Sequence, residues 1–166
     1  MRDAVAGIVA VLLLLVAASL ATSLRTYRRR RERARDGERA LGRTIIAELP
    51  TANDLVLVAE DDRRFYYGDR PIDKDSIVAV RVLINGAPIA SHTSRRQAPA
   101  VAIPPTSFDD RPEGIARDRW DVAVETLAGT VLIECGAIRE RVSQELARTI
   151  FDQIKLDMEE RDRVGL

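Results

Sequence analysis

The pattern of apolar and polar residues changes three times along the 166 residues of the chain. Ala4–Leu24 carries no charged residue, and the segment 25–35 that follows, RTYRRRRERAR, contains seven arginines. Short apolar or alternating runs separated by turn residues fill the middle of the chain, and 137–162 has apolar residues at three- and four-residue steps. This pattern predicts an apolar helix, a basic segment, a β-sheet region and a terminal amphipathic helix.

The apolar run has the length of a membrane-spanning helix. About 20 apolar residues cross the hydrocarbon core of a bilayer, and a helix satisfies its own backbone groups there without water. We therefore predict a transmembrane anchor over residues 1–24. A cleaved secretory signal is the alternative, because Ser19-Leu20-Ala21 matches a small-x-small cleavage pattern and cleavage would leave an exported protein beginning at Thr22.

The arginines after the apolar run indicate the orientation of such an anchor. Basic residues beside a membrane segment stay on the cytoplasmic side, and only Arg2 precedes the run. The prediction is a single-pass protein of the inner (cytoplasmic) membrane, with its N-terminus outside and its C-terminal domain in the cytoplasm. Its implied partners are the lipid bilayer and the anionic lipid headgroups that attract basic side chains. The membrane-proximal basic residues are Arg25, Arg28, Arg29, Arg30, Arg31, Arg33 and Arg35.

The charge distribution argues against nucleic acid as a partner. Residues 25–43 hold nine arginines against three acidic residues, whereas residues 44–166 hold 16 Lys and Arg against 22 Asp and Glu. The net charges of the two stretches are therefore +6 and −6. The region beyond the basic segment does not extend a basic face, which disfavours nucleic acid or anionic lipid as its own ligand.

The next two regions are a connecting segment and a strand-rich domain. Residues 25–50 are compatible with a juxtamembrane helix or linker that ends at Pro50, with Leu41, Ile45 and Ile46 as an apolar stripe. The domain is predicted over residues 51–162, followed by a tail at 163–166. Its expected strands are 54–60, 64–69, 75–84, 87–93, 119–126 and 130–135, with one more short strand at 100–103 in the proline-rich loop 94–118. Asn85-Gly86 supplies the two positive-φ residues of a type I′ hairpin turn.

The last predicted element is an amphipathic helix over 137–162. Its apolar stripe consists of Ile138, Val142, Leu146, Ile150, Phe151, Ile154 and Met158. Strands followed by a single helix place the domain in the α+β class. We expect six or seven antiparallel strands in an open barrel or bent sheet, capped by this helix.

The strand-then-helix order and the stretch RPIDKDSIVAVRV (residues 70–82) resemble a bacterial pleckstrin-homology-like domain. The resemblance covers roughly residues 53–158, and it implies an open barrel that the last helix plugs at one end. Lipid-binding members carry a basic loop between the first two strands, whereas EDDRR at this place has more acids than bases. The resemblance therefore implies no phosphoinositide binding.

Residues with catalytic or metal-binding chemistry are few. The chain has one histidine, His92, and one cysteine, Cys135, so Cys₂His₂ and HExxH zinc sites are excluded. A lone cysteine cannot form an internal disulfide, and Cys135 lies in an apolar run that predicts a core position. The carboxylate pairs Asp61-Asp62, Asp109-Asp110 and Glu159-Glu160 fall in a turn, a loop and a helix end, where solvated acids are expected. We predict no catalytic residue, no cofactor and no metal.

These observations predict a membrane-anchored cytoplasmic adaptor or scaffold domain that binds another protein, without catalytic activity. Free edges of antiparallel sheets suit the addition of a peptide strand from a partner. A membrane-tethered enzyme using dispersed carboxylates is the alternative, and a pocket holding an Asp or Glu with a strongly shifted pKa would favour it. An exported protein after signal cleavage is the other alternative.

Overall fold

A computed structural model describes residues 2–51, 55–96 and 118–164 of the chain, without the side chains of residues 2–12 and 23. The chain divides into two compact units, Met1–Leu41 and Gly42–Leu166.

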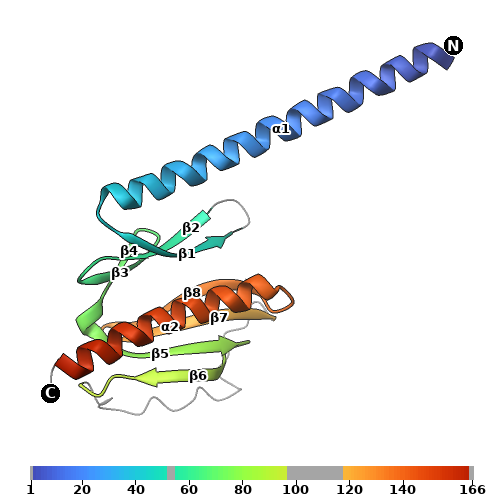
Figure 1. Cartoon of the computed structure of the whole chain (residues 1–166). Helices are drawn as coiled ribbons and strands as arrows, with labels where there is room; N and C mark the ends of the chain where they lie inside the picture. Colours follow the sequence, from blue (N-terminus) through green and yellow to red (C-terminus); the bar gives the residue numbers. More distant parts are fainter. Residues whose placement is uncertain (1, 52–54, 97–117, 165–166) are drawn as a thin grey trace. The chain divides into compact units, whose positions relative to one another are not determined.

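The first unit is one long helix, α1 (Arg2–Ala40), of 39 residues (Figure 1). Leucine, alanine, arginine and glutamate make up most of its sequence, and all four have high intrinsic helix propensity. The helix stops before Gly42, whose φ of +74° is the left-handed conformation that glycine adopts without strain at a helix C-terminus. The described side chains between Leu13 and Arg33 are exposed.

The predicted transmembrane anchor over residues 1–24 is wrong. Among the described residues, no helix is both long enough and apolar enough to cross a membrane. Helix α1 runs without interruption from Leu24 into the arginines of the basic segment. The predicted single-pass topology in the inner membrane, with the N-terminus outside and the domain in the cytoplasm, depends on this anchor and is therefore also wrong.

The stretch predicted as a helix or linker up to Pro50 contains both a helix and a strand. Helix α1 ends at Ala40, and Thr44–Pro50 forms strand β1. The β-branched residues at the start of β1 fit an extended backbone, and pairing with β2 stabilises it. Leu41 is 64 % exposed, so the predicted apolar stripe at a helix end does not form.

The second unit contains two antiparallel four-stranded sheets. Sheet A is a meander in the order β1-β2-β3-β4. Its strands are β1 (Thr44–Pro50), β2 (Leu55–Glu60), β3 (Arg64–Tyr67) and β4 (Arg70–Asp73). A short 3-10 helix, η1 (Lys74–Ser76), then leads out of sheet A.

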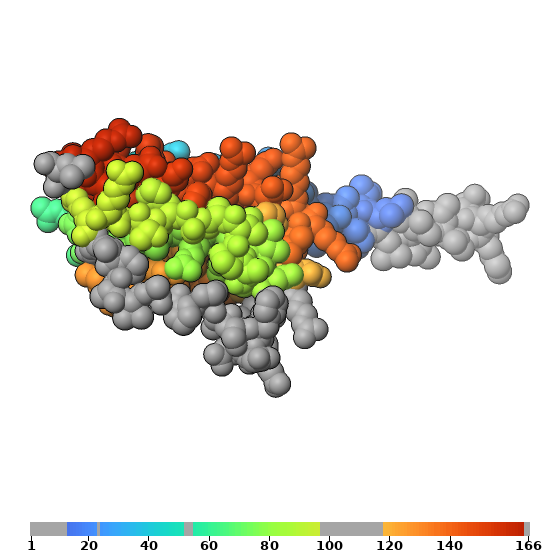
Figure 2. Space-filling model, turned by 90° about the horizontal axis from the view of Figure 1, so that it is seen from below, coloured from blue at the N-terminus to red at the C-terminus, as the bar shows by residue number. Residues whose placement is uncertain are grey.

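Sheet B has the strand order β6-β5-β7-β8, so β5 pairs with strands from two different parts of the chain. Its strands are β5 (Ile77–Ile84), β6 (Ala87–Thr93), β7 (Arg119–Thr126) and β8 (Gly129–Ala137). Asn85 (φ 53°) and Gly86 (φ +79°) join β5 to β6, which confirms the predicted hairpin. Strand β6 is an edge strand, and most of its residues are exposed at the surface (Figure 2).

The expected single barrel or bent sheet of six to seven strands is therefore corrected to eight described strands in two sheets that do not close. No described residue of β4 pairs with β5, because η1 separates them. The α+β class is retained. The strand predicted at 100–103 lies outside the described residues.

Helix α2 (Arg141–Val164) joins the two sheets into one core. It contacts β1 of sheet A and β5, β7 and β8 of sheet B. Ile150, Ile154 and Met158 of the predicted stripe are fully buried, and so is Ala147, which the prediction did not include. Two other members of the predicted stripe do not belong to the buried face, because Val142 is 60 % exposed and Ile138 precedes the helix. The helix begins four residues later than predicted, because Ala137 belongs to β8 and Gly136 (φ +116°) turns the chain.

Candidate functional site

A hollow of about 390 Å³ lies in the second unit, between sheet A and helix α2. We call it the acidic cavity. Five of its lining residues are acidic and one is basic. The lining residues are Gly42, Thr44, Glu60, Asp61, Asp62, Lys74, Gln153, Leu156, Asp157 and Glu160.

Lys74 is the buried basic residue of the acidic cavity, and it is only 7 % exposed. Its Nζ lies 2.9 Å from Oε2 of Glu60 and 3.1 Å from Oδ1 of Asp157. The same ammonium group lies 4.5 Å from the centre of the Phe65 ring. Burial lowers the pKa of Lys74, but the two carboxylates outweigh this effect and raise the pKa above its ordinary value. Lys74 is therefore a charged structural residue.

A second layer of contacts fixes the two carboxylates that hold Lys74. Gln153 Nε2 donates to Oε1 of Glu60 at 2.8 Å, and Arg161 Nε donates to Oδ2 of Asp157 at 2.9 Å. Arg161 also donates to the backbone carbonyl of Lys74. Because Gln153, Asp157 and Arg161 belong to α2, this network ties the helix to sheet A and η1.

Asp61 forms the turn between β2 and β3 at the edge of the acidic cavity. Its Oδ1 accepts the backbone N–H groups of Arg63 and Arg64 at 2.8 and 2.7 Å, and its Oδ2 accepts the hydroxyl of Tyr66 at 2.6 Å. The Tyr66 hydrogen bond, helped by the backbone bonds, lowers the pKa of Asp61. Arg43 stacks on the Tyr66 ring at 3.6 Å. Asp61 is therefore an ionised turn residue.

Asp62 and Glu160 differ from the other acids of the cavity, because both are exposed. They come from the β2–β3 turn and from the last turns of α2. The three other carboxylates are occupied by contacts within the protein, as described above. The two rim carboxylates are consequently the groups best placed to contact an external cation.

A separate polar cluster lies on sheet B. Asp121 is 1 % exposed, and burial raises its pKa even though Arg119 opposes the shift. Arg119 Nε lies 2.7 Å from Oδ1 of Asp121, and its Nη1 lies 3.0 Å from Oε2 of Glu134. Burial, followed by the charge of Asp121, raises the pKa of the Cys135 thiol to about 12. Cys135 is therefore an unreactive core residue, as its sequence context predicts.

The structure brings together some of the acidic residues that the sequence marked and leaves others apart. Asp61, Asp62 and Glu160 line the acidic cavity, whereas Glu159 pairs with Lys155 at 3.7 Å. The pair 109–110 lies outside the described residues. Sequence reasoning missed the central triad of Lys74, Glu60 and Asp157, because these residues come from three separate elements. The one feature of the sequence that could have pointed to this triad is Lys74 itself, since only two of the 26 basic residues are lysines.

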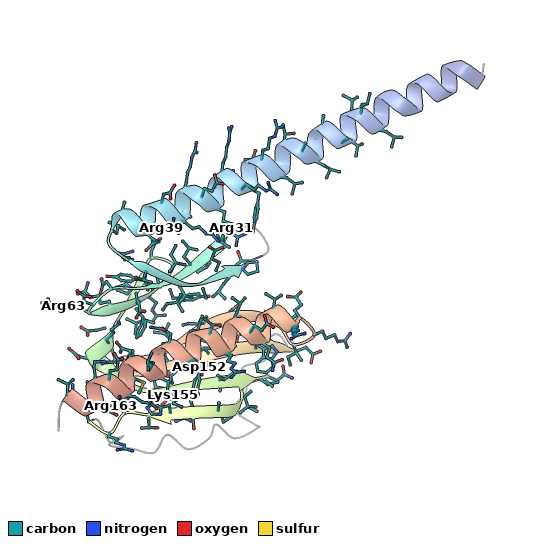
Figure 3. The ribbon with its side chains drawn as sticks, viewed as in Figure 1. Arg31, Arg39, Arg63, Asp152, Lys155 and Arg163 are labelled. Atoms are coloured by element: carbon teal, nitrogen blue, oxygen red, sulfur yellow. The ribbon has the colours of Figure 1, made fainter. Side chains whose placement is uncertain are left out.

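The predicted basic residues all lie on α1. Arg25, Arg28, Arg29, Arg30, Arg31 and Arg33 are exposed, and Arg35 is half-buried. Figure 3 shows Arg31 and Arg39 on this helix. The attraction of this segment to anionic headgroups stays a prediction.

In the described parts of the chain, no group of three or more His, Cys, Asp and Glu side chains is arranged to hold a metal ion. The exposed carboxylates of Asp62 and Glu160 at the acidic cavity are a candidate surface for a cation. No protein family, no curated protein and no solved structure matches this chain.

Proposed function

We propose that the unit Gly42–Leu166 is a protein-interaction domain that binds a basic segment of a partner protein at the acidic cavity. The observation that carries the proposal is the lining of this cavity, with five carboxylates against the single ammonium of Lys74. An excess of negative charge in a concave surface attracts cations and speeds their association. Lysine and arginine side chains are the cations that a partner protein presents.

The environment of these carboxylates supports binding over catalysis. A general acid at neutral pH needs a raised pKa, whereas the pKa of Asp61 is lowered. Asp121 has a raised pKa, but it does not line the acidic cavity. Glu60 and Asp157 are held by Lys74, Gln153 and Arg161. We therefore place the binding function ahead of an enzyme that uses dispersed carboxylates.

The strand-then-helix order of this unit also keeps the resemblance to pleckstrin-homology-like domains as part of the proposal. Its terminal helix α2 packs on both sheets through Ile150 and Ile154. The acidic cavity lies between the β2–β3 turn and this helix.

The experiment uses a nine-residue oligoarginine peptide as the probe and residues 42–166 as the protein. The described core residues, from Ala47 to Met158, all belong to this fragment, so it contains the whole described core. We expect Asp62→Lys with Glu160→Lys to weaken peptide binding about tenfold or more at low salt, because two rim attractions become repulsions. Isothermal titration calorimetry measures the change.

A matched control reverses the same amount of charge elsewhere on α2. Glu145 and Asp152 have side chains that are 65 % and 58 % exposed, and neither lines the cavity. Asp152 is labelled on α2 in Figure 3. Glu145→Lys with Asp152→Lys should weaken binding much less. Equal losses in the two double variants would mean that only overall charge matters, and the proposed site would be rejected.

A further inference from the structure

The basic segment of α1 presents a continuous arginine stripe. Arg25, Arg29 and Arg33 are spaced four residues apart, which places them on one face of the helix over about 12 Å. All three are exposed. The same chain thus carries a basic helical surface in one unit and an acidic cavity in the other.

The charges of these two surfaces are complementary. Residues 25–43 have a net charge of +6 and residues 44–166 a net charge of −6. Arginine is well suited to such a contact, because its planar guanidinium group pairs with carboxylates through two parallel hydrogen bonds. Arg161 shows an arginine–carboxylate contact within the protein, in which Nε and Nη2 lie 2.9 and 2.5 Å from the single oxygen Oδ2 of Asp157.

We propose that the arginine stripe of one copy of this chain docks at the acidic cavity of a second copy, where Asp62 and Glu160 receive its arginines. The inference rests on the proposed function and names its partner. Every copy supplies one basic and one acidic surface, so the contact is heterologous and joins copies head to tail. Its strength depends on salt, because exposed charges are screened within about 8–10 Å at physiological ionic strength.

The test compares residues 25–166 with residues 42–166 by sedimentation velocity over a range of protein concentrations. Both fragments contain the complete described core, and both lack the apolar start of α1. We expect residues 25–166 to associate at 50 mM salt and to become monomeric at 500 mM salt. Residues 42–166 should remain monomeric under both conditions.

Reciprocal charge reversal identifies the contact. In residues 25–166, Arg29→Glu with Arg33→Glu should shift the association midpoint about tenfold higher in concentration, and so should Asp62→Lys with Glu160→Lys. The four substitutions together should restore association. All four positions are exposed, and thermal unfolding of each variant checks that the fold is kept. The pair Glu145→Lys and Asp152→Lys is the control and should leave the midpoint within about threefold.

Three results would overturn the inference. Association that persists after reversal of Asp62 and Glu160 would exclude the cavity as the docking site, and so would failure of the fourfold variant to regain association. If residues 25–166 stay monomeric while residues 42–166 bind oligoarginine, the second copy is rejected as partner and the proposed function stands. If residues 42–166 fail to bind oligoarginine as well, both fail.

Discussion

The carboxylate of Asp162 accepts a hydrogen bond from the hydroxyl of Ser94 at 2.8 Å, across 68 residues of sequence. Its second oxygen accepts the backbone N–H of Arg95, also at 2.8 Å. Burial raises the pKa of Asp162, but the hydrogen bonds from Arg95, Ser94 and Arg96 together outweigh it and lower the pKa below 3.8. This contact holds the end of α2 against the chain that leaves β6.

Asp162→Asn should lower the free energy of unfolding at pH 7 by about 1–3 kcal/mol, because buried donors lose a charged acceptor. The folded-state pKa is depressed, so the carboxylate stabilises the fold above pH 3.8 and loses this effect as the pH falls through the folded pKa. The difference between the native protein and the variant should therefore shrink below pH 3.8. Urea denaturation at pH 7 and pH 3 measures both values.

Asp152→Asn is the matched control for this prediction. Asp152 lies on the same helix and makes only an exposed ion pair with Arg148 at 3.5 Å. Its replacement should cost less than about 0.5 kcal/mol. Equal costs at the two positions would show that the Ser94–Asp162 contact does not anchor the helix.

Lys74→Met should destabilise the second unit by about 3 kcal/mol or more. The substitution leaves the carboxylates of Glu60 and Asp157 without their shared cation, and their side chains are only 15 % and 17 % exposed. Glu60→Gln added to Lys74→Met should recover part of the loss, because one uncompensated charge is removed. Chemical denaturation of the single and double variants gives the coupling energy. Additive effects would contradict the network described here.

Ile150→Asp should cost several kcal/mol, because Ile150 is fully buried in the stripe that α2 packs on both sheets. Val142→Asp on the same helix is the control, since Val142 is 60 % exposed. Gln153, on the same helix, is not suitable as a control because its side chain donates a hydrogen bond to Glu60. Equal denaturation midpoints for the Ile150 and Val142 variants would mean that α2 is not docked.

Gly136→Ala tests how closely α2 approaches the end of β8. A Cβ at Gly136 would lie 2.5 Å from Oγ of Ser143, and the φ of +116° is itself strained for alanine. We expect a loss of about 1–3 kcal/mol in unfolding free energy, partly recovered by Ser143→Ala. Gly129→Ala separates the two causes, because Gly129 has a φ of +136° and nothing within 4 Å of its Cβ position. If Gly129→Ala lowers the unfolding free energy as much as Gly136→Ala does, the backbone conformation alone explains the loss, and the contact with Ser143 contributes nothing.

Local patterns predicted much of the second unit. The Asn85-Gly86 turn predicts the β5–β6 hairpin, and the spacing of Ile150, Ile154 and Met158 predicts the buried face of α2, so both features follow from the residues themselves. Strand β1 was missed because its short apolar stretch fits a helix end as well as a strand. Its pairing with β2, a tertiary contact, decides between the two. The apolar run before the arginines is long enough in sequence to span a membrane. Among the described residues, however, no helix is long and apolar enough to do so.

The sequence by itself determined the order of most strands, the terminal helix, the core position of Cys135 and the opposite net charges of residues 25–43 and 44–166, because these depend on composition and on short-range periodicity. Only the tertiary structure decided that the strands form two sheets, and that Glu60, Lys74 and Asp157 meet beside Asp62 and Glu160. Residues as far apart in sequence as Gly42 and Glu160 reach one cavity only after α2 packs on sheet A. No local pattern of residues encodes that distance.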